Sequence, residues 1–416
     1  MLAMASGSKA MATGSMAMAP GSMAMATGSL RKVSAGLAGG NNYARMMSTV
    51  NWDDCGLSAF EQGVGGTRML KLKRASELTQ CNILAKCEFE NPGGSIKDRA
   101  ALSMILDAEK RGVLKRGEKG IIIEGTAGNT GIGLALAAAV FGYKCVICIA
   151  SSQSEEKKNT LRRAGAHLVE VPAVPYRDPN NYVHVAKRLA EAIESNSEIS
   201  YRSLYANQWD NLANRQAHEH GTGPEILAQT GGKIDAFSCA MGTGGTLTGV
   251  AKFLRSKLPD VKIGLTDPCG AAIYRYFKDG ELRAEGSSIS EGIGQGRITG
   301  NMEGFSPDLL FEIPDTEMMD VMLDLQRFDG LAVGGSSAIN VAGAIRVAKE
   351  LGPGHTVCTV LCDLGERYAS KLYNEHFLHS KGLPVAPWLK SVADQKIVDE
   401  EFFRVVETAT DVAKKH

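Results

Sequence analysis

The chain has 416 residues, and Lys plus Arg equal Asp plus Glu at 46 each, which makes the formal net charge zero. This length favours two or three domains, and the neutral charge argues against a nucleic-acid binder, which carries a basic surface. Nine cysteines are too few, and odd in number, for a disulfide scaffold, and the longest apolar run, at 133–141, is far shorter than the ~20 residues of a membrane helix. We therefore expect neither nucleic acid nor a membrane span.

Residues 1–52 differ in composition from the rest of the chain. They contain no Asp or Glu, and seven-residue repeats begin at Met4, Met11, Met18 and Met25. Each repeat contains a Gly-Ser pair, which disfavours a long helix and favours a disordered low-complexity arm. Its basic, acid-free and Ser-rich composition is typical of an organelle transit peptide. We expect a mitochondrial address first and a plastid second, with a cytosolic location if the arm is not a transit peptide.

From residue 53 onward, short apolar runs alternate with helical patterns. The predicted strands are 121–124, 145–150, 167–171, 234–240, 262–267 and 356–363, and the predicted helices follow Gly131 and span 154–164, 181–195, 245–257 and 336–351. Strands that alternate with helices of this length predict βαβ units in mainly parallel sheets covered on both faces. Two sets of such units predict two α/β domains, and ligands of such sheets bind beyond the carboxyl ends of the strands.

The first chemical motif is NPGGSIKDR, residues 91–99. It places Lys97 after a Pro-Gly-Gly turn and before a helix-forming stretch, with Ser95 as a candidate cap and Asp98 in the first helical turn. A lone lysine is nearly always a solvated charge. A lysine held at a helix start beneath a rigid turn is instead suited to form a Schiff base.

The second motif is EGTAGNTGIGLA, residues 124–135, which follows a predicted strand and opens a helix. Backbone N–H groups, hydroxyls and an amide at a helix N-terminus form a site for a carboxylate or a phosphate. A glycine-rich turn without any ligand is the alternative interpretation of this motif taken alone.

The third motif is MGTGGTLTG, residues 241–249, again between a strand and a helix. Its glycines allow close backbone approach, and its threonines add hydroxyls, which suits one terminal phosphate dianion. Leu247 stands where the dinucleotide fingerprint needs its third glycine, and no glycine loop ends in G-K-[ST], so neither a usual NAD site nor a usual ATP site is indicated. The glycine-rich stretch at 290–300 is interpreted as a flexible loop near a cleft.

The order and spacing of NPGGSIKDR, EGTAGNTGIGLA, YANQWDN, MGTGGTLTG and EGIG resemble the cysteine synthase (O-acetylserine sulfhydrylase) family of fold type II pyridoxal-phosphate enzymes. The resemblance covers about residues 55–385, and the LCD-x-G and KLYN stretches look most like the fungal and bacterial branch. It implies two open, twisted, mainly parallel sheets, as in the tryptophan synthase β chain, with the active site between the domains. The implied larger domain is 53–87 plus 205–390, the smaller is 88–204, and 391–416 is a helical tail.

The resemblance implies a role for each motif residue, with pyridoxal 5'-phosphate as the cofactor. Lys97 forms the Schiff base and moves the Cα proton, and Asn129 bonds the ring oxygen of the cofactor. The cofactor phosphate is bound by Gly242, Thr243, Gly244, Gly245 and Thr246. The substrate carboxylate is bound by Thr126, Ala127, Gly128, Asn129, Thr130 and Gln208. Gly292 to Gly294 lie beside the substrate.

Two positions depart from the pattern of the family. Ala127 replaces a serine of the carboxylate loop, which removes a hydroxyl but keeps the backbone N–H. Leu364 aligns with the serine that pairs with the pyridine nitrogen and cannot form a hydrogen bond. Asp363 or Cys362 is the candidate substitute, or the nitrogen stays unpaired. An aspartate partner would protonate the ring and strengthen it as an electron sink.

The resemblance implies a transferase that replaces the acetate of O-acetyl-L-serine with sulfide and so forms L-cysteine. Sister activities stay open: cystathionine β-synthase, β-cyanoalanine synthase, and serine or threonine dehydratase. A weakly catalytic binding or regulatory protein is the alternative from another class, kept open by Ala127 and Leu364. The family also implies a homodimer, and some members bind the tail of a serine acetyltransferase.

Two other side-chain patterns are not assigned to chemistry. Cys145 and Cys148 form a C-x-x-C, but they lie inside an apolar strand pattern, which predicts core residues rather than a redox pair. His218 and His220 lack the spacing of metal ligands, and we expect a helix surface there. No metal site is predicted.

Overall fold

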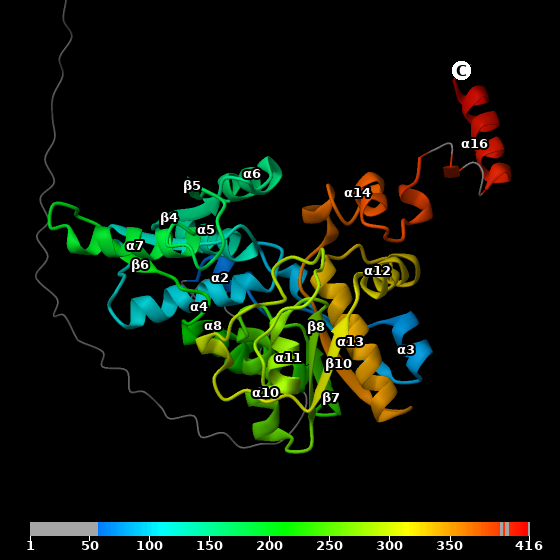
Figure 1. Ribbon diagram of the computed structural model, residues 1–416, viewed down its shortest axis with the longest axis horizontal. Coiled ribbons are helices and arrows are strands. Elements are labelled where there is room, and N and C mark those ends of the chain that lie inside the picture. Colours follow the sequence, from blue (N-terminus) through cyan, green and yellow to red (C-terminus); the bar gives the residue numbers. More distant parts are fainter. Residues whose placement is uncertain (1–56, 392–393, 396–398, 415–416) are drawn as a thin grey trace, which may run out of the picture.

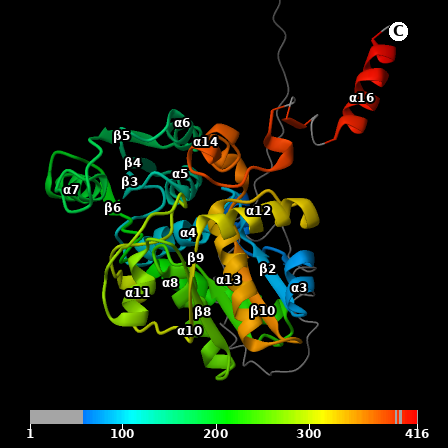
Figure 2. The same cartoon turned by 45° about the vertical axis from the view of Figure 1, so that its right-hand side comes forward.

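The computed structural model describes residues 57–391, 394–395 and 399–414. The predicted disordered arm and transit peptide at 1–52 lie outside these residues. The described chain forms one sheet of six strands and one of four, with helices on both faces of each sheet (Figures 1 and 2). This arrangement confirms the predicted α/β class with two mainly parallel sheets.

The smaller sheet comes from one continuous part of the chain and is parallel throughout. Its strand order is β5-β4-β3-β6, with β3 at Gly120–Gly125, β4 at Lys144–Ala150, β5 at His167–Val171 and β6 at Arg202–Tyr205. Successive residues of β3 point to opposite faces, so Ile122 packs on the side of α5 (Asn129–Phe141) and Ile123 on the side of α7 (Tyr182–Ser195).

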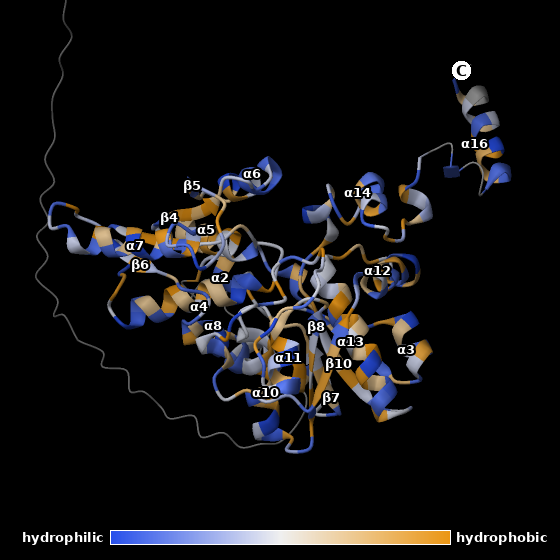
Figure 3. Ribbon diagram, viewed as in Figure 1, coloured by the Kyte–Doolittle hydropathy of each residue, from blue (hydrophilic) through white to orange (hydrophobic). Residues whose placement is uncertain are grey.

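Helix α5 is apolar nearly all round, which is typical of an interior helix rather than a surface one. It packs between β3 and β4 on one side and α4 (Lys97–Lys110) on the other, and its ribbon is mostly orange in Figure 3. Helix α4 in turn contacts α8 (Leu212–Ala217). The helix that carries Lys97 is therefore fixed against both halves of the fold.

The larger sheet takes its strands from two distant parts of the chain. Its order is β1-β2-β10-β7-β8-β9, with β1 at Met69–Lys71, β2 at Asn82–Cys87, β7 at Ala236–Cys239, β8 at Lys262–Pro268, β9 at Leu309–Ile313 and β10 at Thr356–Leu361. The β1–β2 pair is antiparallel and every other pair is parallel. Val357 packs toward α13 (Gly335–Leu351) and its neighbour Cys358 toward α10 (Gly245–Lys257), so these helices cover opposite faces.

Eight further helices and several turns complete the described chain. The helices are α2 (Ala59–Gly63), α3 (Lys73–Thr79), α6 (Glu155–Arg163), α9 (Gly223–Gln229), α11 (Ala272–Asp279), α12 (Asp315–Asp329), α14 (Glu375–Ser380) and α16 (Glu400–Ala413). The 3₁₀ turns are η1 (Glu88–Glu90), η3 (Gly300–Met302), η4 (Gly365–Tyr368) and η5 (Pro387–Leu389), and η2 (His218–Thr222) is a π turn. Figures 1 and 2 show α16 away from both sheets. Among the described helices, none combines the length and apolarity needed to cross a bilayer.

The six predicted strands and the four helices predicted with both ends are confirmed, each with ends within two residues of the expected ones. The helix predicted after Gly131 is confirmed as α5, which begins earlier, at Asn129. The stretch at 290–300 contains no strand, and only its last residue enters the short turn η3. The loops that the motifs occupy therefore lie between the elements that the sequence predicts.

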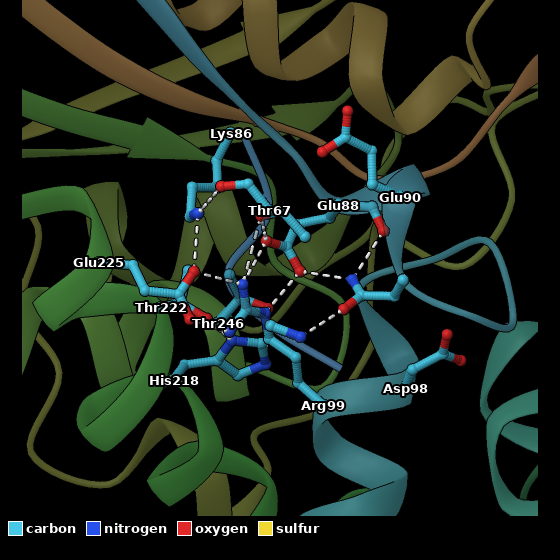
Figure 4. A network of polar contacts seen from close by, with 12 residues as sticks. Thr67, Lys86, Glu88, Glu90, Asp98, Arg99, His218, Thr222, Glu225 and Thr246 are labelled. Carbon is cyan, nitrogen blue, oxygen red and sulfur yellow. Dashed lines mark hydrogen bonds and ion pairs between the residues drawn. The ribbon is translucent and has the colours of Figure 1, made fainter. Parts of the chain in front are cut away.

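A buried network of charges lies beneath the start of α4 (Figure 4). The Arg99 guanidinium donates to both carboxylate oxygens of Glu88 at 2.6 and 2.8 Å and to both of Glu225 at 2.7 and 2.8 Å. Lys86, which is fully buried, pairs with Glu225 at 2.7 Å. Burial would raise the pKa of Glu225, but the hydrogen bonds and charge of Arg99 dominate and lower it to about 2. Two cations and two anions thus balance in the interior.

Replacing Arg99 with Met is expected to lower the free energy of unfolding by about 3–5 kcal/mol. The reason is that the carboxylates of Glu88 and Glu225 would stay buried with Lys86 as the one remaining cation of the network. The matched control is Lys115→Met, whose ion pair with Glu118 is exposed to solvent and should give no measurable change. Urea unfolding of both variants measures the effect. An Arg99→Met variant as stable as the control would show that the network is not needed for folding.

Candidate active site

The three sequence motifs meet at one cleft of about 490 Å³. The motif at 91–99 follows β2 and its turn η1, the motif at 124–135 follows β3, and the motif at 241–249 follows β7. Each motif lies at the carboxyl end of a parallel strand, which is where open α/β sheets bind ligands. Because β3 belongs to the smaller sheet and β2 and β7 to the larger, the cleft lies between the two.

Nearly all the residues singled out in the sequence line this region. The cleft wall includes Lys97, Thr126, Ala127, Gly128, Asn129, Thr130, Gln208 and Thr243. Lys97 also lines an adjoining hollow of about 30 Å³ together with Gly242, Thr243, Gly244 and Thr246. Gly245 lies just behind, where a Cβ atom would come within 2.3 Å of the Asn214 Oδ1 atom. Gly292 and Ile293 reach the cleft from the irregular stretch at 290–300.

Lys97 is the first residue of α4 and is held by the turn before it. The expected helix cap by Ser95 is wrong, because the N-cap residue of α4 is Ile96 and has no side-chain cap. The Ser95 hydroxyl instead accepts the backbone N–H of Lys97 at 3.2 Å from one residue further back. Asp98 is buried in the first turn, where its Oδ2 atom accepts the Gly93 N–H at 2.6 Å and fixes the Pro-Gly-Gly turn. The half-buried Lys97 side chain has no hydrogen-bond or ion-pair partner in the described part of the chain. Its amino group is therefore not engaged by other side chains, and Lys97 lines the cleft.

The loop at 126–130 is braced from behind by a chain of polar contacts. The Thr130 hydroxyl donates to Gln208 Oε1 at 2.6 Å, and Gln208 donates from its side chain and its backbone to Glu124, both at 3.3 Å. Glu124 is fully buried at the end of β3. Burial raises the pKa of Glu124 to about 7, although the hydrogen bonds from Gln208 act in the opposite direction. The loop and the start of α5 thus present backbone N–H groups to the cleft in a fixed position, which suits a carboxylate.

The Asn129 side chain joins the two halves of the site. Its Nδ2 atom donates to Asp363 Oδ2 at 2.7 Å, and its Oδ1 atom accepts from Arg367. Tyr368 donates to the same Asp363 oxygen at 2.7 Å. Burial raises the pKa of Asp363, while the hydrogen bonds from Asn129 and Tyr368 oppose that shift. One N–H of Asn129 remains available to donate into the cleft.

The residues after β10 clarify the departure at Leu364. Cys362 lines both the cleft and the adjoining hollow, whereas Asp363 and Leu364 line neither. The Leu364 backbone bridges to Val333, and the Asp363 carboxylate is engaged by Asn129. Of the two candidate substitutes, Cys362 is therefore the one that lines the cleft. Burial raises the pKa of this thiol to about 11, so it is present as S–H, a weak donor.

The loop at 241–246 has the shape of an anion cradle. A Cβ atom at Gly242 would come within 2.4 Å of the Gly292 carbonyl oxygen, so only glycine fits there. Gly244 has a φ of +87°, which favours glycine as well. The Thr243 hydroxyl accepts from Asn214 Nδ2 at 2.9 Å, and the loop then opens the 13-residue helix α10. A helix N-terminus of this length with a glycine turn suits a phosphate group.

An ion-pair cluster spans the mouth of the cleft. Glu291 forms an ion pair with Lys157 of α6, a helix beside the smaller sheet. It forms a second ion pair, at 2.5 Å, with Lys371, which follows β10 of the larger sheet. Burial would raise the pKa of Glu291, but the two lysines dominate and hold it below its ordinary value. With Glu156 and Arg367, which line the same region, the mouth carries three cations and two carboxylates, and this excess of positive charge favours entry of a small anion.

Other residues of the cleft were not singled out from the sequence alone, among them Trp209, Ser336, Arg367 and Tyr368. Trp209 follows Gln208 directly, and Arg367 and Tyr368 belong to the G-E-R-Y stretch, so proximity to a motif was the available signal. Ser336 stands at the start of α13 after two glycines. The Gly-Gly-Ser-Ser sequence does not follow a predicted strand, so it is a weaker signal than the positions of Trp209, Arg367 and Tyr368.

The two patterns set aside have different outcomes. Cys145 and Cys148 are buried in β4, and burial raises their pKa values to about 12 and about 11, so the core interpretation is confirmed. The expected helix surface at 218–220 is wrong for His218, which is 1% exposed within the π turn η2. The His218 side chain is buried because α10 packs on this turn, whereas His220 is exposed as expected. Among the described residues, no group of His, Cys, Asp and Glu is placed to hold a metal ion.

Comparison with known proteins gives consistent matches. The family described as pyridoxal-phosphate dependent enzyme matches residues 60–363. Cysteine synthase 1 of Emericella nidulans is 47% identical over 335 residues, which covers 79% of this chain and 87% of that protein. A Saccharomyces cerevisiae protein, whose name proposes a mitochondrial cysteine synthase, is 39% identical over 76% of this chain and 84% of its own. The crystal structure of O-ureido-L-serine synthase has a TM-score of 0.67 and 32% identity, covering 76% of this chain and 95% of that one.

Glu124→Gln is expected to change how stability depends on pH. With a pKa raised from 4.5 to about 7, the folded protein keeps the Glu124 proton that the unfolded chain loses, so wild-type stability falls as the pH rises through this range. Glutamine has no proton to lose. The variant should therefore gain stability relative to the wild type, on the order of 3 kcal/mol by pH 8.

Urea unfolding of both proteins between pH 4 and pH 8 measures this difference. At about pH 4, the folded and the unfolded wild type both hold most of the Glu124 proton. The difference in stability between wild type and variant at this pH is therefore the control for the difference at pH 8. A difference in stability that is equal at both ends of the range would contradict the assignment of the proton to Glu124.

Proposed function

Because the chain belongs to the family of pyridoxal-phosphate dependent enzymes, we propose that it is a cysteine synthase, which converts O-acetyl-L-serine and sulfide to L-cysteine and acetate. One observation carries this proposal: an unpaired, half-buried Lys97 stands between a carboxylate-type loop and a phosphate-type loop in a single cleft. The identity of 47% to a cysteine synthase over most of both chains supports the choice of reaction. The cofactor is pyridoxal 5'-phosphate.

The residues present fit this cofactor. The cradle at 242–246 excludes side chains at Gly242 and Gly245, leaving backbone N–H groups and two threonine hydroxyls for a phosphate. Lys97 has an amine free to bond the aldehyde, and the cleft volume of about 490 Å³ lies within the usual range for small-ligand sites. Asn129 and Cys362 are the residues that would contact the ring. When bound, the cofactor supplies an electron sink for charge that develops at the substrate Cα.

The chain's own residues would divide the remaining work. The N–H groups and hydroxyls of the loop at 126–130, with Gln208, hold the substrate carboxylate and so fix the direction of its Cα–H bond. The amine of Lys97 takes the Cα proton as general base and later returns it to the same carbon. The Cβ–O bond breaks and acetate leaves with that electron pair; sulfide then forms the Cβ–S bond.

The departure at Ala127 alters the strength of this site rather than its nature. Alanine supplies the same backbone N–H as serine, but one hydroxyl donor is missing. A single neutral hydrogen bond contributes about 0.5–1.5 kcal/mol, so we propose a substrate KM raised by roughly three- to tenfold over a site with serine. The sister replacement reactions differ from this one in the nucleophile, whereas the dehydratases use none in place of sulfide. They are tested below because one solved relative has a different name, O-ureido-L-serine synthase.

Lys97→Ala is expected to abolish formation of L-cysteine, because no other described lysine lines the inner part of the cleft where the motifs meet. The purified wild type, supplied with O-acetylserine and sulfide, should release cysteine and acetate in equal amounts. Lys371→Ala, at the mouth, is the matched control and should retain turnover. Turnover retained by Lys97→Ala would falsify the assignment of the base.

The same assay separates the sister activities. Homocysteine or cyanide in place of sulfide tests the cystathionine and cyanoalanine reactions, and serine or threonine alone tests the dehydratases. A larger kcat/KM with any of these would move the proposal to that reaction. Tight binding of a serine acetyltransferase tail peptide without any turnover would favour a regulatory protein.

We also propose that the segment at 1–52 directs import into mitochondria, that the protein is a homodimer able to bind a serine acetyltransferase, and that its domains divide at about 88 and 205. The acid-free composition of the segment supports import, as does the name of the yeast relative. A fluorescent protein fused behind 1–52 is expected to enter mitochondria, while a fusion in which Arg31, Lys32 and Arg45 are Glu should not. A plastid or diffuse signal for the first fusion would overturn this location.

A further inference from the structure

His218 lies near the buried charge network and contacts the phosphate-type loop. It belongs to the π turn η2, a geometry that is frequent at functional sites, and it is 1% exposed. Its Nδ1 atom lies 2.9 Å from the Thr222 hydroxyl and its Nε2 atom lies 3.3 Å from the Thr246 hydroxyl (Figure 4). Thr246 lines the hollow beside Lys97, whereas His218 does not. The imidazole therefore acts on the hollow through Thr246.

The imidazole is neutral, which leaves it one donor and one acceptor nitrogen. Burial lowers the pKa of His218 to about 3, and the nearby Arg99 charge lowers it further. Lys97 acts in the same direction, while Glu88 and Glu225 oppose both cations. The ring consequently keeps its single proton throughout the physiological pH range.

The position of that proton follows from Thr222. This residue is fully buried, and within the described chain its hydroxyl has one hydrogen-bond partner, the Nδ1 atom of His218. A buried hydroxyl donates its proton where an acceptor is present, so Nδ1 accepts and the ring proton is on Nε2. Nε2–H then donates to the Thr246 oxygen, and the Thr246 proton is free to point into the hollow.

We propose that His218 is a positioning residue that turns the Thr246 hydroxyl into an obligatory donor toward the phosphate of the cofactor. The three hydrogen bonds run in one direction, from Thr222 through His218 and Thr246 to the anion. Each donor in such a chain polarises the next, which strengthens the last bond, the one to the negative phosphate. This inference rests on the proposed binding of the phosphate by the loop at 242–246.

The test measures the phosphate of the holoenzyme rather than its turnover. In His218→Leu, the ³¹P resonance of the bound cofactor should shift, and the rate of cofactor release into a trapping solution should rise by roughly three- to tenfold, the equivalent of one hydrogen bond. His218→Gln, whose side-chain N–H replaces Nε2–H, should restore both values. His220→Leu, on the exposed side of the same turn, is the matched control and should change neither.

Two further variants separate the possible failures. Thr246→Val should shift the resonance and speed release, and adding His218→Leu to it should have no further effect. If Thr246→Val changes nothing, the placement of the phosphate is wrong, together with this inference. If Thr246→Val has the expected effect and His218→Leu has none, this inference alone is wrong. If His218→Leu does not fold, Thr222→Val tests the chain instead, and an unchanged resonance there would overturn the proposal.

Discussion

The buried guanidinium of Arg99 is the interaction on which the position of the site depends. It stands two residues after Lys97 on α4 and is held from two sides, by Glu88 of the turn η1, directly after β2, and by Glu225 on α9. A buried charge tolerates little displacement, because each lost contact leaves an anion without compensation. The network therefore fixes the position of the first turn of α4. The backbone of Lys97 is fixed with it, which limits where the side chain can place its amino group in the cleft.

The site combines two sheets whose strand ends supply different chemistry. The smaller sheet contributes the loop after β3, backed by Glu124 and Gln208, and the larger sheet contributes the loops after β2, β7 and β10. Asn129 belongs to the first group, yet its partners Asp363 and Arg367 belong to the second. The polar contacts across the cleft are thus part of the site itself. Orientation of a ligand and the relative position of the sheets are determined by the same side chains.

The sequence was informative where chemistry needs a local pattern. A glycine loop between a buried strand and a helix is visible in the residues, so the three motifs and the strands β3, β4, β5, β7, β8 and β10 were predicted. The strands β1, β6 and β9 were missed, and they are edge strands of only three to five residues. The internal strand β2 was missed as well, because the buried Lys86 interrupts its apolar run. His218 was misjudged because its burial depends on α10, which lies about 30 residues further along the chain, and no local periodicity reports such a contact. The choice between Cys362 and Asp363 could not be made from the sequence either, because it depends on which of the two side chains lines the cleft.

The pairing of β2 with β10 has a consequence for the order in which the molecule can be built. These central strands of the larger sheet are joined in register from Asn82↔Thr356 onward, whereas the smaller sheet uses only residues 120–205. During synthesis from the N-terminus, the smaller sheet can be completed while β2 still lacks its neighbour, and closing so long a loop makes that last pairing slow. Ile96, next to Lys97, donates its backbone N–H to Cys362. The lysine thus reaches its final place only when nearly the whole chain has been made, which leaves the nascent protein without a formed catalytic centre.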